Sequence, residues 1–311
     1  MPRLEEKAMT ARVRPGQDGQ WQVVVGQGPM AFRREHFHDR AAAEAWASMA
    51  ALSARLCLVR IGSKRFLGTA AEALRRWAID QGTLPRSEGG TQLAPLQRLG
   101  PLMADPDCAL PLAALLPADL AALRARRLAA LGCPDTALVE QAALAAALEQ
   151  FRDFHLPALE DPFAEVAPDG LCVLDEAACA QLLSQAGRVG TALERMVGLM
   201  LTTATPLPAL LRWSSAQADR AAGLLHRPDG PPVPAPAELL PPPGTAPTTP
   251  LLPGLDRAAA ERGLAALGAA LGRPGLAPEA LRLTALTQAL NQGGHLDEAL
   301  RLAGARAALV G

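Results

Sequence analysis

The pattern of apolar and polar positions divides the chain into a short β segment followed by a long run of helices. Trp21–Val25 and Phe32–Arg34 flank a Gly26-Gln-Gly28 turn, an arrangement typical of a β-hairpin. Farther along, Leu and Ala recur at helical spacing behind residues that can cap a helix, such as Asp39 and Thr69. The helices are expected over residues 39–55, 69–80, 92–104, 117–131, 134–153, 174–186, 190–204, 206–222, 255–271, 278–291 and 295–309. The chain is therefore predicted to be mainly α with a small N-terminal β-hairpin module.

Two proline-containing segments interrupt this helical pattern. Residues 156–170 lack helical spacing and indicate a boundary between domains. Residues 228–253 contain eleven prolines, a composition typical of a linker. These breaks predict a β/α module over 1–66, a helical domain over 67–156, and a further domain over 170–311 with the Pro-rich insert 228–253.

Composition narrows the class of protein. With 311 residues, 50% hydrophobic and 20% charged, the chain can bury a sizeable core in two or three domains. Aromatic residues make up only 3%, so packing should rest on small aliphatic side chains. No apolar run reaches the roughly 18 residues of a spanning helix, and the start lacks a signal-peptide core. We therefore expect a soluble, cytoplasmic protein that makes no membrane contact.

Segments along nearly the whole chain follow the order of one known family. The strands and the helix over Asp39–Trp46 come first, and Gly68–Trp77 and Leu110–Arg127 follow. Leu174–Leu183 and Leu276–Thr284 complete the order. Together these segments resemble the tyrosine recombinases, the phage-type site-specific integrases. The resemblance implies an arm-binding-like module, a core-binding-like helical domain and a catalytic-like domain, in a protein of mobile-element origin related to DNA integration and recombination.

The resemblance also implies that most catalytic positions of that family have changed. Ala204 stands where the first arginine belongs, and Leu207 replaces a glutamate. Glu279 takes the place of the histidine in the His-x-x-Arg box, of which Arg282 alone is retained. Ala303-Gly304-Ala305 matches the later Leu-Gly-His pattern. Arg282 is thus a catalytic remnant, or a helix residue in a surface ion pair.

The nucleophile and the lysine of the family are missing as well. These 311 residues contain no tyrosine, and the only lysines, Lys7 and Lys64, precede the catalytic-like domain. The sequence ends at Gly311, before the helix that would carry the nucleophile. We expect a degenerate recombinase that cannot cleave or rejoin DNA.

Charge is distributed unevenly between the two ends of the chain. Residues 1–80 carry 13 Lys and Arg against 8 Asp and Glu, which leaves 17 against 23 for the rest. Guanidinium groups suit phosphate because they stay charged and bind in a bidentate way. The candidate residues for double-stranded DNA are Arg12, Arg14, Arg33, Arg34, Lys64 and Arg65, and on one helical face Arg124 and Arg127. The alternative to DNA binding is that both groups lie on a solvent-exposed strand or helix face.

No metal site or cofactor is expected. The five cysteines are scattered without a Cys-x-x-Cys pair, and they read as small core residues. His36 and His38 share a strand face without a third ligand, and His295 follows a Gly-Gly turn.

Several functions remain open at this point. The first is an integrase-like DNA-binding protein that acts beside a catalytically intact integrase or another protein partner. The alternatives are a helical protein-interaction module that uses the acidic second half, a decaying integrase remnant without DNA binding, and an active recombinase with its nucleophile supplied in trans.

Overall fold

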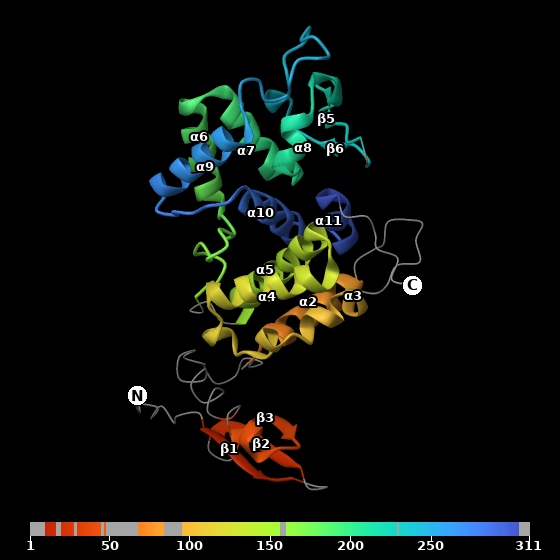
Figure 1. Cartoon of the computed structure of the whole chain (residues 1–311). Coiled ribbons are helices and arrows are strands. Elements are labelled where there is room, and N and C mark those ends of the chain that lie inside the picture. Colours follow the sequence, from red (N-terminus) through yellow and green to blue (C-terminus); the bar gives the residue numbers. More distant parts are fainter. Residues whose placement is uncertain are drawn as a thin grey trace, which may run out of the picture.

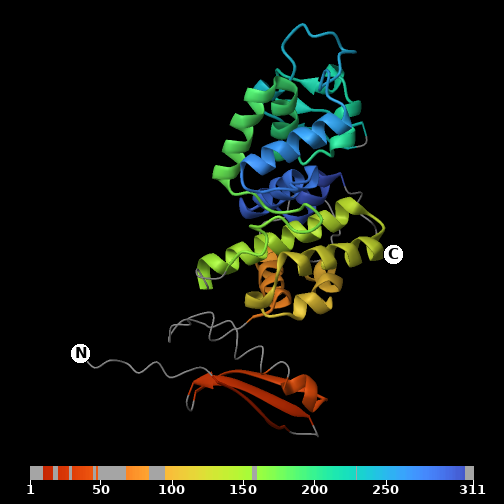
Figure 2. The ribbon, with the colours of Figure 1, turned by 60° about the vertical axis from the view of Figure 1, so that its left-hand side comes forward.

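The computed structural model shows a small sheet followed by a succession of helices (Figure 1). The residues that it describes are 10–16, 20–27, 30–44, 47, 68–83, 95–155, 160–228 and 230–304. Within these ranges the fold is mainly helical with a small N-terminal sheet, as the sequence predicts. The sheet lies apart from the helices that follow residue 68 in both views (Figures 1 and 2).

The N-terminal sheet has three strands in place of a single hairpin. Strands β1 (Thr10–Pro15), β2 (Trp21–Gln27) and β3 (Met30–Phe37) are antiparallel, in the order β1-β2-β3. The next helical turn begins at Asp39, whose carboxylate accepts a hydrogen bond from the Ala42 N–H at 3.0 Å. The predicted hairpin is therefore confirmed as β2–β3, the predicted cap is confirmed, and β1 extends the sheet.

Four helices form the first helical body. They are α2 (Ala70–Thr83), α3 (Pro95–Met103), α4 (Pro117–Leu131) and α5 (Pro134–His155). The Thr69 hydroxyl accepts from the Glu72 N–H at 3.3 Å, which confirms the predicted helix start. Helix α4 ends at Gly132, whose φ of +61° is a left-handed conformation that glycine adopts readily. The core of this body holds Leu74, Trp77, Leu99, Leu120, Leu123, Leu144 and Leu148.

Helix α5 is also covered by two helices from the far end of the chain. Helices α10 (Pro278–Asn291) and α11 (Leu296–Ala303) pack on α5, and Figure 2 shows α10 beside it. Leu283, Leu286, Leu290, Leu296 and Ala299 belong to the same core as the first four helices. This core therefore joins residues from both predicted helical parts, 67–156 and 170–311.

The chain leaves the first body and returns to it at neighbouring points. The N–H of Ala277, just before α10, donates to the carbonyl oxygen of Gly170 at 2.9 Å. Gly170 has a φ of +81°, and a Cβ there would lie 2.7 Å from the Gly275 oxygen. Glycine is required at this crossing because the backbones approach too closely for a side chain.

The residues in between form a second core. Helices α6 (Glu176–Val189), α7 (Thr191–Thr203), α8 (Leu207–Arg212) and α9 (Arg257–Ala270) surround it, together with the short strands β4 (Ala218–Asp219), β5 (Leu224–Leu225) and β6 (Val233–Pro234). Leu182, Met196, Leu199, Leu210 and Leu264 are buried in it. Asp175 and Asp256 cap α6 and α9 by accepting backbone N–H bonds at 2.7 Å.

Two expectations about this region are wrong. The helix predicted over 206–222 ends at Arg212, because residues after it bond to the Pro-rich segment instead. The Ser215 N–H donates to the Thr249 oxygen at 2.8 Å, and the Leu251 N–H donates to the Trp213 oxygen at 2.8 Å. The second error is the interpretation of 228–253 as a linker. Its apolar residues are buried in the second core: Val233, Ala235, Leu240, Leu251 and Leu252.

Candidate nucleic-acid interface

Two rows of residues cross the N-terminal sheet side by side. The register aligns Arg12 with Val24 and Arg34, and Arg14 with Gln22 and His36. Positions 12 and 14 of one strand lie on the same face because side chains alternate along a strand. We call these two rows the basic face. Arg12 and Arg14 are exposed to solvent.

The opposite face of the sheet is the covered one. Val13 aligns with Val23, which is fully buried, and Trp21 aligns with Phe37. The guanidinium of Arg40, in the helical turn after the sheet, lies 5.1 Å from the Trp21 ring centroid. Arg12, Arg14 and Arg34 therefore belong by register to the face opposite the buried Val23.

Arg14 is held in one orientation by its cross-strand neighbour. Its Nε and Nη2 atoms donate to the same oxygen, Oε1 of Gln22, at 2.9 and 2.7 Å. A long arginine side chain on a strand surface ordinarily samples many rotamers, and a cross-strand hydrogen bond restricts them. The guanidinium of Arg14 is therefore positioned before any ligand arrives.

The other predicted N-terminal residues are placed differently. Arg33 aligns with Val25 and Ala11, so its register position belongs to the covered face. Arg34 alone of this pair falls in the rows of the basic face. Lys64 and Arg65 lie outside the described residues.

Arg124 and Arg127 of α4 form ion pairs within the chain. Arg124 donates from Nε and Nη2 to both carboxylate oxygens of Asp169 at 2.7 and 2.6 Å. Arg127 binds Glu140 of α5 in the same bidentate way, at 2.7 and 2.8 Å, and this hydrogen bonding raises the pKa of Arg127. Their exposed fractions are 7% and 9%. A DNA contact from either side chain would require its ion pair to open, so that expectation stays a prediction.

Arg282 is buried at the junction of three segments. Its Nε donates to the Ala204 oxygen at 2.8 Å, and its Nη2 donates to Asp135 Oδ1 at 2.7 Å and to the Ala303 oxygen at 3.1 Å. Only 4% of the residue is exposed. Ala204 itself has a left-handed φ of +49°, which turns the chain after α7. The expectation of a surface ion pair is wrong, because this guanidinium joins α5, α7 and α11 in the interior.

Arg227 is a half-buried cation beside Arg282, and no sequence motif singled it out. Its Nη2 donates to the Thr203 oxygen at 2.7 Å, and its Nη1 donates to the Arg301 oxygen at 2.9 Å. Burial, followed by the charge of Arg282, lowers the pKa of Arg227 to about 10. Both arginines are thus engaged mainly by backbone carbonyls, in the manner of structural cross-links.

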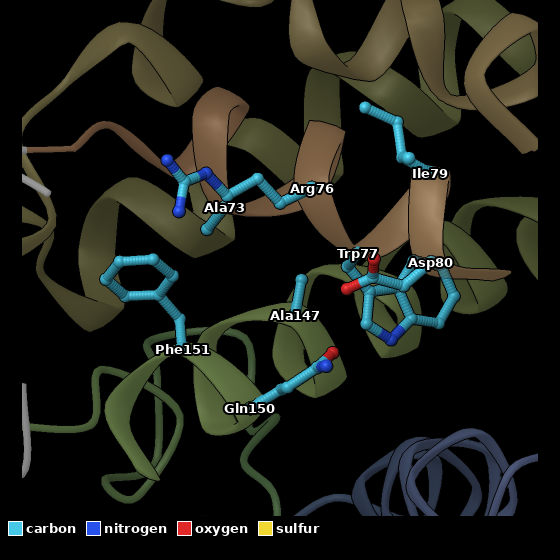
Figure 3. A pocket seen from close by; sticks show the side chains of 8 residues that line it. All are labelled: Ala73, Arg76, Trp77, Ile79, Asp80, Ala147, Gln150 and Phe151. Atoms are coloured by element: carbon cyan, nitrogen blue, oxygen red, sulfur yellow. The ribbon is translucent and has the colours of Figure 1, made fainter. Parts of the chain in front are cut away.

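A hollow of about 240 Å³ lies between α2 and α5 (Figure 3). Trp77 and Phe151 form its buried apolar part, and Arg76, Asp80 and Gln150 lie among the polar residues that line it. A larger cleft of about 630 Å³ lies among α5, α10 and residues 161–176. Among the predicted arginines whose side chains the structure describes, Arg12, Arg14, Arg124 and Arg127 line neither space.

The described residues offer neither a metal-binding group nor a membrane span. Within them, no three His, Cys, Asp or Glu side chains gather closely enough to hold a metal ion. No helix among the same residues is long and apolar enough to cross a membrane. Cys108, Cys133, Cys172 and Cys179 are free thiols, and burial raises the pKa of Cys108 to about 12. Buried neutral thiols of this kind are packing residues rather than nucleophiles.

Comparison with known proteins gives likenesses at the level of structure. No protein-family model matches the chain, and no curated protein matches it. Among solved structures, XerA recombinase is 17% identical, with 76% of this chain and 89% of that chain covered and a TM-score of 0.37. The Tn1549 transposon integrase in complex with transposon right end DNA is 14% identical, with 76% and 91% covered and a TM-score of 0.36. A lambda integrase tetramer bound to a Holliday junction is 15% identical, with 100% and 98% covered and a TM-score of 0.34.

Two positions that the sequence resemblance assigns to catalysis, Ala204 and Arg282, lie close together. Arg282 donates hydrogen bonds to the backbone oxygens of Ala204 and Ala303 in one buried network. Leu207, at the position of the family's glutamate, is 2% exposed and packs in the second core. The described side chains at these positions serve packing and internal hydrogen bonding.

Proposed function

We propose that this integrase-like protein binds double-stranded DNA through the basic face of its N-terminal sheet. The observation that carries the proposal is the pair of rows in which exposed Arg12 and Arg14 align with Arg34 and His36. A sheet face with arginines at alternate positions can follow a phosphate backbone, and β-sheet proteins that bind DNA place strands in a groove. The excess of positive charge over residues 1–80 supports the same surface.

We further propose that the protein does not cleave or rejoin strands itself. Transition-state stabilisation at a phosphate needs donors that are free to meet the developing charge. The guanidinium of Arg282 is instead engaged by Asp135 and two backbone carbonyls. By the sequence resemblance, the family's histidine, first arginine and glutamate are replaced by Glu279, Ala204 and Leu207. The protein would then act at recombination sites of a mobile element as an accessory or competitor, beside an intact integrase.

The binding half of the proposal is tested by a salt series. Fluorescence anisotropy of a labelled duplex is measured with the unmodified chain and with Arg12→Ala plus Arg14→Ala. The control is Arg257→Ala plus Arg262→Ala, which removes the same charge from exposed positions of α9. We expect the first variant to bind more weakly and to lower the slope of log K against log salt by about 0.9 for each lost phosphate contact. Equal effects of both variants, or no salt-dependent binding by the unmodified chain, would contradict the proposal.

The catalytic half is tested separately with supercoiled plasmid. We expect neither nicked product nor a covalent protein–DNA adduct after incubation and denaturing electrophoresis. An adduct formed by the purified chain alone would show that an unrecognised nucleophile acts here.

A further inference from the structure

We propose that Arg14 reads a guanine base in the bound duplex and that Gln22 is a positioning residue for this contact. The inference rests on the proposed DNA binding of the basic face and adds a base preference to it. It starts from the side-chain geometry of β1 and β2, where one guanidinium is held by a neutral acceptor.

The hydrogen bonds to Gln22 occupy only one edge of the guanidinium. Arginine carries five N–H donors and no acceptor. The single N–H of Nε and one N–H of Nη2 point to Gln22 Oε1, with N···O distances of 2.9 and 2.7 Å. Three N–H groups are left for a ligand, and two of them form a parallel pair at the outer end, one on Nη1 and one on Nη2. Arg14 is exposed, so this outer pair is available to a molecule that approaches the sheet.

Guanine is the base that matches a parallel pair of donors. Its major-groove edge presents two adjacent acceptors, N7 and O6, whereas adenine pairs an acceptor with a donor. Cytosine presents a donor, and thymine presents one acceptor beside a methyl group. Because arginine cannot accept a hydrogen bond, the donors of adenine and cytosine are left unmatched opposite Arg14. The chemistry of the outer pair therefore selects guanine.

Arg12 provides the internal comparison. Its cross-strand neighbour is Val24, which has no side-chain acceptor to hold a guanidinium. Arg12 is exposed on the same face, two residues from Arg14. It has the same charge without the same orienting partner, so we assign it a phosphate contact that is independent of sequence.

The experiment selects bound sequences from a random duplex library and then measures affinities for the selected duplex and for single-base replacements. The unmodified chain should favour guanine over adenine at one position by about tenfold or more. Arg14→Lys keeps the charge but loses the bidentate geometry, so the preference should disappear while salt-dependent binding to the pool is retained. Arg12→Lys should leave the preference unchanged.

The role of Gln22 is tested by two substitutions at that position. Gln22→Met removes the acceptor with little change in size, and it should reduce the guanine preference several-fold. Gln22→Glu restores an acceptor and should rescue the preference even where total affinity falls. Retained salt-dependent binding to the unselected pool shows that each variant still folds.

The possible results separate this inference from the proposed function. Binding without any guanine preference, or a preference that survives Arg14→Lys, would overturn the base contact and leave DNA binding intact. A preference unaffected by Gln22→Met would remove the positioning role. If the unmodified chain shows no salt-dependent binding at all, both the function and the inference fall.

Discussion

Replacement of Arg282 by methionine should destabilise the fold strongly without touching DNA binding. The change removes three hydrogen bonds and leaves the Ala204 and Ala303 oxygens without this donor. A buried acceptor that loses its partner costs about 1–3 kcal/mol, and a broken buried ion pair costs about 3–5 kcal/mol. Asp135 is 28% exposed at its side chain, so water recovers part of the loss. We expect the free energy of unfolding to fall by about 3–4 kcal/mol in total.

Urea unfolding followed by far-UV circular dichroism measures this change. The matched control is Arg262→Met, at an exposed position of α9, which should stay within about 0.5 kcal/mol of the unmodified chain. Duplex affinity of Arg282→Met, measured below its unfolding midpoint, should equal that of the unmodified chain. A stability loss below about 1 kcal/mol, together with weaker DNA binding, would refute the structural role and favour a phosphate contact.

Three further predictions follow from the two cores. Gln141 is fully buried, and neither of its amide atoms has a hydrogen-bond partner in the described part of the chain, so Gln141→Met should raise the free energy of unfolding by about 1–2 kcal/mol. A urea midpoint that falls instead would indicate an undetected partner. Leu240→Ala in the Pro-rich segment should cost about 2–5 kcal/mol, whereas the same change in a free linker costs nothing. Burial raises the pKa of Cys108 from 9.0 to about 12, so its contribution to stability is present below pH 9 and is lost as pH rises from 9 to 12. Cys108→Ala should therefore lose less stability between pH 8 and about 11 than the unmodified chain, as judged by urea midpoints at each pH.

The helices were predictable where local signals decide their bounds. Residues 117–131 and 278–291 form helices over the predicted ranges because proline stands at N1 of each and the Leu spacing supports a buried face. Thr69 acts as a helix cap from its own side chain. Such features depend on residues a few positions apart, and the sequence displays them directly.

The pattern of apolar and polar positions did not predict the contacts between distant segments. Arg124 and Arg127 lie near one helical face as expected, but their partners are 45 and 13 residues away in sequence. Helix α8 stops early because backbone groups near Trp213 bond to Thr249 and Leu251. Gln22 was not singled out for the candidate site because its role appears only once the β1–β2 register is known. Local propensity contains no information about any of these pairings.

The hydrogen bond between Ala277 and Gly170 brings together the two ends of residues 171–276, which are inserted between α5 and α10. Residues 171–276 leave and return at neighbouring points, and they also contact the flanking stretches, because α7 packs on α10 and Arg227 donates to the Arg301 oxygen. The flanking stretches complete a single core around α5. A change in length within 171–276 need not separate residues 170 and 277, because the ends of this segment are adjacent. We expect a fragment that ends at 156 to expose the face of α5 that α10 and α11 cover, and deletion of 171–276 to remove the Ala204 acceptor of Arg282.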